Sequence, residues 1–174
     1  MNILQKMILV FVCLSAAVLS ADEILLKTFR KEIFCGSSKN NQIQLEHIKG
    51  GARVTVKKRK DSEQIDPTHI QLVCAYKPGL KAETSYKVTF TVKASRGCRI
   101  SGGVIGDRKP WTYFVRQWYI LTPDKPRTES IEFTPEADTG AIRTPCLFLG
   151  ELPVGTVFTI TDVKLYKIQQ PETK

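Results

Sequence analysis

Residues 147–165 read LFLGELPVGTVFTITDVKL, and this stretch decides the fold. Two apolar runs, Cys146–Leu149 and Val157–Leu165, flank a connection that contains glycine and proline. In the second run, the odd-numbered residues share one side of an extended chain and the even-numbered residues share the other. This period of two, in a segment rich in β-branched residues, is typical of a strand. The pattern predicts a strand, a turn and a closing strand around which the earlier strands pack.

The rest of the chain contains further short segments with strand patterns, separated by turn residues. They are Ile24–Phe34, Gln42–Ile48, Ala52–Lys58, His69–Tyr76, Tyr86–Ser95, Cys98–Ile105, Trp111–Leu121 and Arg127–Thr134. Gly50-Gly51 predicts a hairpin turn, because glycine adopts the positive φ angles that tight hairpins need. No segment has the period of an amphipathic helix. The sequence therefore predicts an all-β protein, a sandwich or barrel of about ten short antiparallel strands.

The first twenty residues have the composition of a secretory signal peptide. Lys6 precedes an apolar run, Met7–Val12, and the small residues Ser20 and Ala21 follow. We therefore predict a signal peptide over residues 1–20 and a single domain over residues 21–174, secreted to the periplasm or the extracellular space. No other segment is long and apolar enough to be a transmembrane segment.

Four cysteines remain after residue 20: Cys35, Cys74, Cys98 and Cys146. An even number in an oxidising compartment predicts two disulfide bridges, and three connectivities are possible. Their spacings contain no CxxC pair, which argues against a zinc site.

The chain without residues 1–20 carries 25 basic and 17 acidic residues, a formal net charge of +8. Such a charge favours acidic partners, for example an acidic glycan or a cell surface. A soluble basic surface explains it as well, and the one dense run, Lys57–Lys60, fits a solvated hairpin end. We expect no specific binding of nucleic acid.

The sequence lacks the usual signals of an enzyme. It contains no HExxH, GxSxG or phosphate-binding loop, and Gly102-Gly103 indicates a bulge or a close approach inside a strand. His47 and His69 are far apart and lie within strand patterns. Glu129 and Glu132 have opposite strand parity, so they cannot flank one sugar. We predict that the protein is not an enzyme.

Two stretches resemble a known family. Residues 69–95, HIQLVCAYKPGLKAETSYKVTFTVKAS, and the ending at 147–165 are similar to the strand motifs of carbohydrate-binding modules of families four and nine. The order of features matches from Gly51 to about Lys167. This resemblance implies a galactose-binding-like jelly roll, a β-sandwich that binds a polysaccharide or other glycan without cutting it.

The resemblance also bears on metal binding. The first aspartate of the closing motif often helps to hold a structural calcium in such modules, but Thr161 stands there and only Asp162 remains. Glu23 and Glu32 cannot be placed as ligands. We expect no cofactor, and a structural calcium is the alternative that the sequence leaves open.

The segment WTYFVRQWY, residues 111–119, offers what a sugar site needs. Sugar rings stack their C–H faces on aromatic rings, and their hydroxyls bind polar groups. The candidate ligand-binding residues are Trp111, Tyr113, Gln117 and Tyr119 on one face, with Arg116 and Trp118 on the other. One face must be core. We favour a core of Phe114, Trp118 and Ile120, although Val115 and Leu121 on the first face also allow the reverse.

The expected function is that of a secreted, lectin-like module that binds a glycan in a groove on one sheet. Lys87, Thr89, Thr91 and Lys93 could line the same groove, but an ordinary solvated sheet face is the favoured interpretation of these residues. The alternative is a structural or adhesive protein that uses this sheet face to dock another protein.

Overall fold

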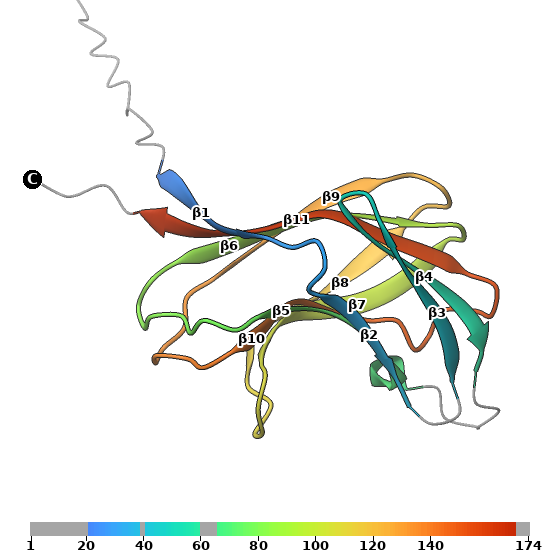
Figure 1. Cartoon of the computed structure of the whole chain (residues 1–174), viewed down its shortest axis with the longest axis horizontal. Coiled ribbons are helices and arrows are strands. Elements are labelled where there is room, and N and C mark those ends of the chain that lie inside the picture. Colours follow the sequence, from blue (N-terminus) through green and yellow to red (C-terminus); the bar gives the residue numbers. More distant parts are fainter. Residues whose placement is uncertain (1–20, 39–40, 60–65, 170–174) are drawn as a thin grey trace, which may run out of the picture.

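The computed structural model describes residues 21–38, 41–59 and 66–169, and it is a sandwich of two antiparallel sheets (Figure 1). The strands are β1 (Asp22–Thr28), β2 (Ile33–Ser37), β3 (Gln42–Ile48), β4 (Gly51–Lys58), β5 (Ile70–Tyr76), β6 (Tyr86–Ala94), β7 (Cys98–Gly106), β8 (Tyr113–Leu121), β9 (Arg127–Phe133), β10 (Ile142–Phe148) and β11 (Val157–Gln169). A short 3₁₀ helix, η1 (Pro67–His69), precedes β5. The predicted all-β class and sandwich architecture are confirmed.

The closing strand β11 is at the centre of the six-stranded sheet, whose order is β3-β4-β11-β6-β9. One edge of β11 pairs with β6, while its other edge pairs first with β4 and then with β1. The hairpin predicted at Gly50 joins β3 to β4, and Gly50 has a φ of 78°. The predicted central role of this strand is thus confirmed.

The second sheet has five strands in the order β2-β5-β10-β7-β8. Its inner face meets the six-stranded sheet, and the side chains between the two sheets form one apolar core. Fully buried members from both sheets include Leu72, Phe90, Leu147 and Ile160. The outer face of the five-stranded sheet is turned away from the sandwich, and no other element covers it in Figure 1.

A bulge interrupts the alternation that the sequence shows along β11. Asp162 has a φ of 55°, and the pairing with β6 shifts register between Thr161 and Lys164. Phe158 and Ile160 point into the core before the bulge, and Val163 and Leu165 do so after it. One inserted residue changes which parity is buried, so the strand keeps apolar side chains inward along both halves.

The predicted single strand over Ile24–Phe34 is wrong: this segment forms β1 and the start of β2, which belong to different sheets. Phe29 lies between the strands, fully buried, and its N–H donates to the Val163 carbonyl. The break lets the chain cross from one sheet to the other. β2 itself runs from Ile33 to Ser37, beyond the end of the predicted strand.

The prediction of two disulfide bridges does not agree with the structure, in which all four cysteines of the described residues are free. Cys74 points into the core between the sheets, whereas Cys146 belongs to a separate apolar cluster on the outer face. Cys35 pairs in register with Leu72 rather than with Cys74. Burial raises the pKa of the Cys35 and Cys146 thiols to about 12 and raises that of Cys74 as well, so these groups stay protonated and are poor nucleophiles.

The predicted signal peptide, residues 1–20, lies outside the described residues. None of the helices in the described part of the chain is long and apolar enough to cross a membrane.

Candidate functional site

The structure corrects the predicted faces of the segment at 111–121. A bulge at Phe114 places Val104 opposite Val115 and Ile105 opposite Tyr113. Phe114 turns toward the core, where its ring lies 6.2 Å from that of Phe133. Beyond the bulge, the even-numbered residues point outward, so the outer face of β8 combines residues from both predicted faces.

Tyr119 was expected on the exposed face, yet it belongs to the core with an exposed fraction of 1%. Its ring meets Phe90 edge-on at 5.8 Å, and its hydroxyl accepts a hydrogen bond of 2.9 Å from the Gln117 amide. Trp118 was expected in the core and is 46% exposed, and Ile120 is 71% exposed. The reverse assignment, which the sequence left open, is therefore correct over this half of the strand. The side chains of Gln117 and Tyr119 therefore lie on the opposite side of β8 from that of Trp118.

Four of the six predicted site residues share the outer face of the five-stranded sheet, namely Trp111, Tyr113, Arg116 and Trp118. Trp111 and Tyr113 are also large and exposed. The Trp111 ring lies 4.5 Å from the guanidinium carbon of Arg143 on β10, and the Tyr113 ring lies 6.4 Å from that of Phe148. We call this surface the aromatic face, and its outward side chains are Phe34, Arg99, Ile105, Trp111, Tyr113, Arg116, Trp118, Arg143 and Phe148.

The floor of the aromatic face is a small apolar cluster separate from the main core. It consists of Val73, Ile105, Cys146 and Phe148, which come from three adjacent strands. Arg116 covers part of this floor, since its guanidinium carbon lies 5.5 Å from the Phe148 ring. The run CLFL at 146–149 is apolar on both sides of the strand, a sequence signal that β10 also carries apolar side chains on its outer face.

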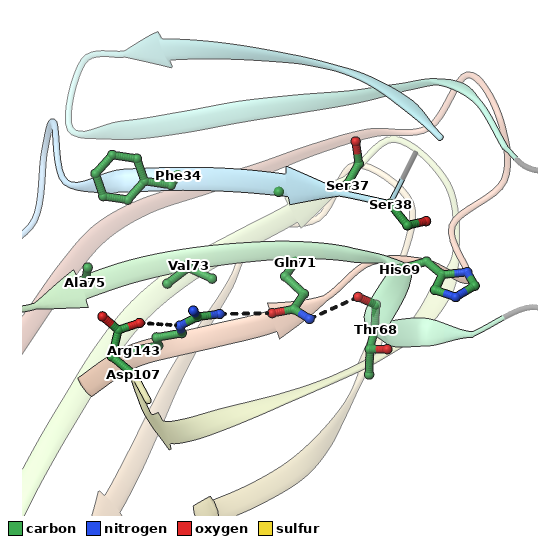
Figure 2. A pocket seen from close by; sticks show the side chains of 11 residues that line it. Phe34, Ser37, Ser38, Thr68, His69, Gln71, Val73, Ala75, Asp107 and Arg143 are labelled. Atoms are coloured by element: carbon green, nitrogen blue, oxygen red, sulfur yellow. Dashed lines mark hydrogen bonds and ion pairs between the residues drawn. The ribbon is translucent and has the colours of Figure 1, made fainter. Parts of the chain in front are cut away.

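A hollow of about 590 Å³ opens beside this floor, over β2, β5 and β10 (Figure 2). A chain of polar contacts crosses it. The Arg143 guanidinium donates to Asp107 at 2.7 Å and to the Gln71 side chain at 3.3 Å, and Gln71 donates to the Thr68 carbonyl. These groups are held in place and present further donors and acceptors to a ligand. Phe34, 55% exposed, forms an apolar wall of the hollow.

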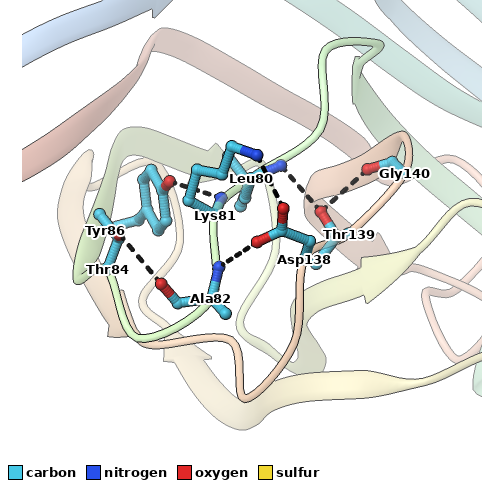
Figure 3. Close-up of polar contacts among 8 residues, drawn as sticks. All are labelled: Leu80, Lys81, Ala82, Thr84, Tyr86, Asp138, Thr139 and Gly140. Atoms are coloured by element: carbon cyan, nitrogen blue, oxygen red, sulfur yellow. Dashed lines mark hydrogen bonds and ion pairs between the residues drawn. The ribbon is translucent and has the colours of Figure 1, made fainter.

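A second hollow, of about 830 Å³, lies between the β7–β8 connection and the loop at 134–141. Asp107 borders both hollows. Asp138 anchors the loop, because its carboxylate accepts hydrogen bonds from the Lys81 ammonium and the Ala82 N–H (Figure 3). The bond from Lys81 lowers the pKa of Asp138 below its ordinary value, so this carboxylate is ionised at neutral pH.

The acidic residues near the start of the domain, Glu23 and Glu32, form ion pairs with lysines. Glu23 binds Lys87, and Glu32 binds Lys27 at 2.7 Å. The described residues contain no group of three or more His, Cys, Asp or Glu side chains that could hold a metal ion.

Lys87, Thr89, Thr91 and Lys93 do not line the aromatic face, in agreement with the interpretation of these residues as an ordinary solvated sheet face. These residues lie on β6, in the six-stranded sheet, with their side chains on its outer side. The sandwich core separates them from the aromatic face. Sequence reasoning also missed Gln71, Arg143 and Phe148, because their strands are distant in sequence and only the sheet order brings them beside β8.

Comparison with solved structures supports the jelly-roll fold. No family model matches the chain, and no curated protein matches it in sequence. A solved structure described as "CBM4 structure and function" is 20% identical, with a TM-score of 0.64 over 84% of this chain and 94% of that chain. The N-terminal cellulose-binding domain of β-1,4-glucanase C from Cellulomonas fimi is 18% identical, with a TM-score of 0.56 over 82% and 90%.

A third structure, the apo form of BiXyn10A CBM1, is 18% identical, with a TM-score of 0.55 over 86% of this chain and 97% of that chain. At these identities the likeness concerns the fold. The chain has the β-sandwich jelly-roll fold of carbohydrate-binding modules, as the motifs at 69–95 and 147–165 predicted, and it spans nearly the whole of each of these modules.

Proposed function

We propose that this protein is a secreted, non-catalytic carbohydrate-binding module that holds a glycan chain across the aromatic face. One observation carries the proposal: three large exposed aromatic side chains, Trp111, Tyr113 and Trp118, gather on one sheet face beside a polar hollow. Large exposed aromatic side chains clustered on one surface mark an interaction site. The fold shared with carbohydrate-binding modules indicates which kind of ligand to test.

The chemistry of the face suits a sugar chain. Aromatic rings stack on the C–H faces of sugar rings, while Gln71 and Arg143 can exchange hydrogen bonds with hydroxyl groups. Both side chains are already fixed by neighbours, so little side-chain freedom is lost on binding. The two hollows continue the face at either side of Asp107, which gives room for several sugar units.

The carboxylates near the face favour binding over catalysis. A glycosidase needs one carboxylic acid of raised pKa opposite a second carboxylate. Asp107 instead binds Arg143, and the pKa of Asp138 is lowered by Lys81. We therefore propose a function without bond cleavage and without a cofactor.

A glycan array with matched variants tests this function. Trp111→Ala, Tyr113→Ala and Trp118→Ala should each weaken binding at least about tenfold, in line with the loss of a stacked aromatic ring. Thr91→Ala, on the outer side of the other sheet, is the control and should bind as the wild type does. Glycan binding by the wild type that all three variants retain would refute the proposed site. An absence of glycan binding together with concentration-dependent self-assembly would instead support a protein-docking role.

A further inference from the structure

The aromatic face carries three arginines, and each lies over an aromatic ring. The guanidinium carbon of Arg99 is 4.0 Å from the centre of the Trp118 ring, and that of Arg143 is 4.5 Å from the Trp111 ring. Arg116 lies 5.7 Å from the Tyr113 ring and 5.9 Å from the Trp118 ring. The positive groups are therefore part of the surface that would contact a sugar.

Two of these arginines lack a counter-charge among the described residues. Within the described residues, Arg143 forms an ion pair with Asp107, whereas neither Arg99 nor Arg116 pairs with an acidic side chain. Arg116 makes one long hydrogen bond, 3.4 Å, to the Ser101 hydroxyl. A guanidinium group has five N–H donors, so most of those on Arg99 and Arg116 remain available to a ligand.

The position of Arg99 discriminates between neutral and anionic sugars. A neutral sugar that stacks on the covered side of Trp118 must displace Arg99 and gains no charge interaction in return. An anionic sugar can leave Arg99 on the ring, where a guanidinium is well placed, and bind its free N–H edge. A carboxylate matches the planar fork of a guanidinium with two parallel hydrogen bonds.

We propose that the glycan held by the aromatic face is a polyuronate, a polysaccharide whose sugars carry carboxylate groups, and that Arg99 and Arg116 bind those carboxylates. A uronate ring keeps an apolar C–H face for stacking and adds the charge that the two arginines lack. This inference rests on the proposed glycan-binding function and specifies its ligand class.

Calorimetric titration in 0.15 M NaCl tests the proposal. The probes are polygalacturonate, alginate and hyaluronan, each compared with its methyl-esterified form, which has the same backbone without charge. We expect at least one polyuronate to bind at least about tenfold more tightly than its ester. Arg99→Gln combined with Arg116→Gln should remove that preference, while Lys57→Gln combined with Lys58→Gln, an equal loss of charge on exposed residues of β4, should preserve it.

Arg99→Gln alone separates a lost contact from a damaged fold. It should weaken binding of the polyuronate about tenfold and leave binding of the ester unchanged or tighter, because the Trp118 ring is uncovered. Equal binding of acid and ester would overturn the polyuronate inference and leave the glycan function standing. Binding of dextran sulfate alone would also overturn it. If no glycan binds, with or without charge, both proposals fail.

Discussion

The reversed orientation of β8 makes a sharp prediction about two neighbouring residues. Tyr119→Ala should destabilise the protein strongly, because the side chain is 1% exposed and packs edge-on against Phe90. Truncation of a buried large aromatic side chain costs about 3–5 kcal/mol of unfolding free energy. At about 2–4 °C per kcal/mol for a domain of this size, Tm should fall by roughly 6–20 °C.

Trp118→Ala should change stability little by comparison. Its side chain is 46% exposed and its main contact is the stacked Arg99, so the loss should be about 1 kcal/mol or less. Tyr119→Phe, which removes only the hydroxyl that accepts from Gln117, should cost about 0.5–1.5 kcal/mol. Urea denaturation followed by far-UV circular dichroism measures all three. A larger loss for Trp118→Ala than for Tyr119→Ala would refute the assignment of faces.

Three further predictions follow from local contacts. A Cβ at Gly103 would lie 1.9 Å from the Val115 carbonyl oxygen, so Gly103→Ala should separate β7 from β8. We expect the free energy of unfolding, measured by urea denaturation, to fall by about 1–3 kcal/mol. An unchanged midpoint of the urea transition would contradict this packing. The hydrogen bond from Lys27 lowers the pKa of Glu32 from 4.5 to about 2, so the stabilisation by this ion pair is complete above pH 4.5 and is lost as the pH falls toward 2. The Tm of Glu32→Gln should therefore fall less over that pH range than the wild-type Tm. Curves of Tm against pH that run parallel for the two proteins would exclude the ion pair. Excess EDTA should leave Tm and glycan binding unchanged, because the described residues contain no group of three or more His, Cys, Asp or Glu side chains that could hold a metal ion, and a lowered Tm would reveal a metal site.

The sequence predicted the strands well where one face of the strand is polar. Gln42–Ile48 and the span from Tyr86 alternate cleanly, and both strands begin where expected. Bulges defeated the same reasoning at Phe114 and Asp162, because one inserted residue changes which parity is buried and leaves no local mark in the sequence. In both strands, the predicted alternation of side chains between the two faces therefore holds only up to the bulge.

The candidate site could be predicted only in part for a related reason. The aromatic residues of β8 stand out in sequence, but Gln71 and Arg143 join them only through the order β5-β10-β7-β8, which pairs strands distant along the chain. The spacing between the cysteines does not reveal that Cys146 belongs to the apolar cluster on the outer face. The prediction of disulfide bridges was wrong for the same reason, because spacing does not show which face of a sheet a cysteine occupies.

The most direct test of the proposed glycan site is a map of the bound surface by NMR chemical-shift perturbation. A bound glycan should shift the side-chain signals of Gln71, Arg116 and Trp118, all on the five-stranded sheet, and leave Thr91 and Thr159 on the six-stranded sheet unchanged. Perturbations confined to the threonine side of the sandwich would contradict the proposed site.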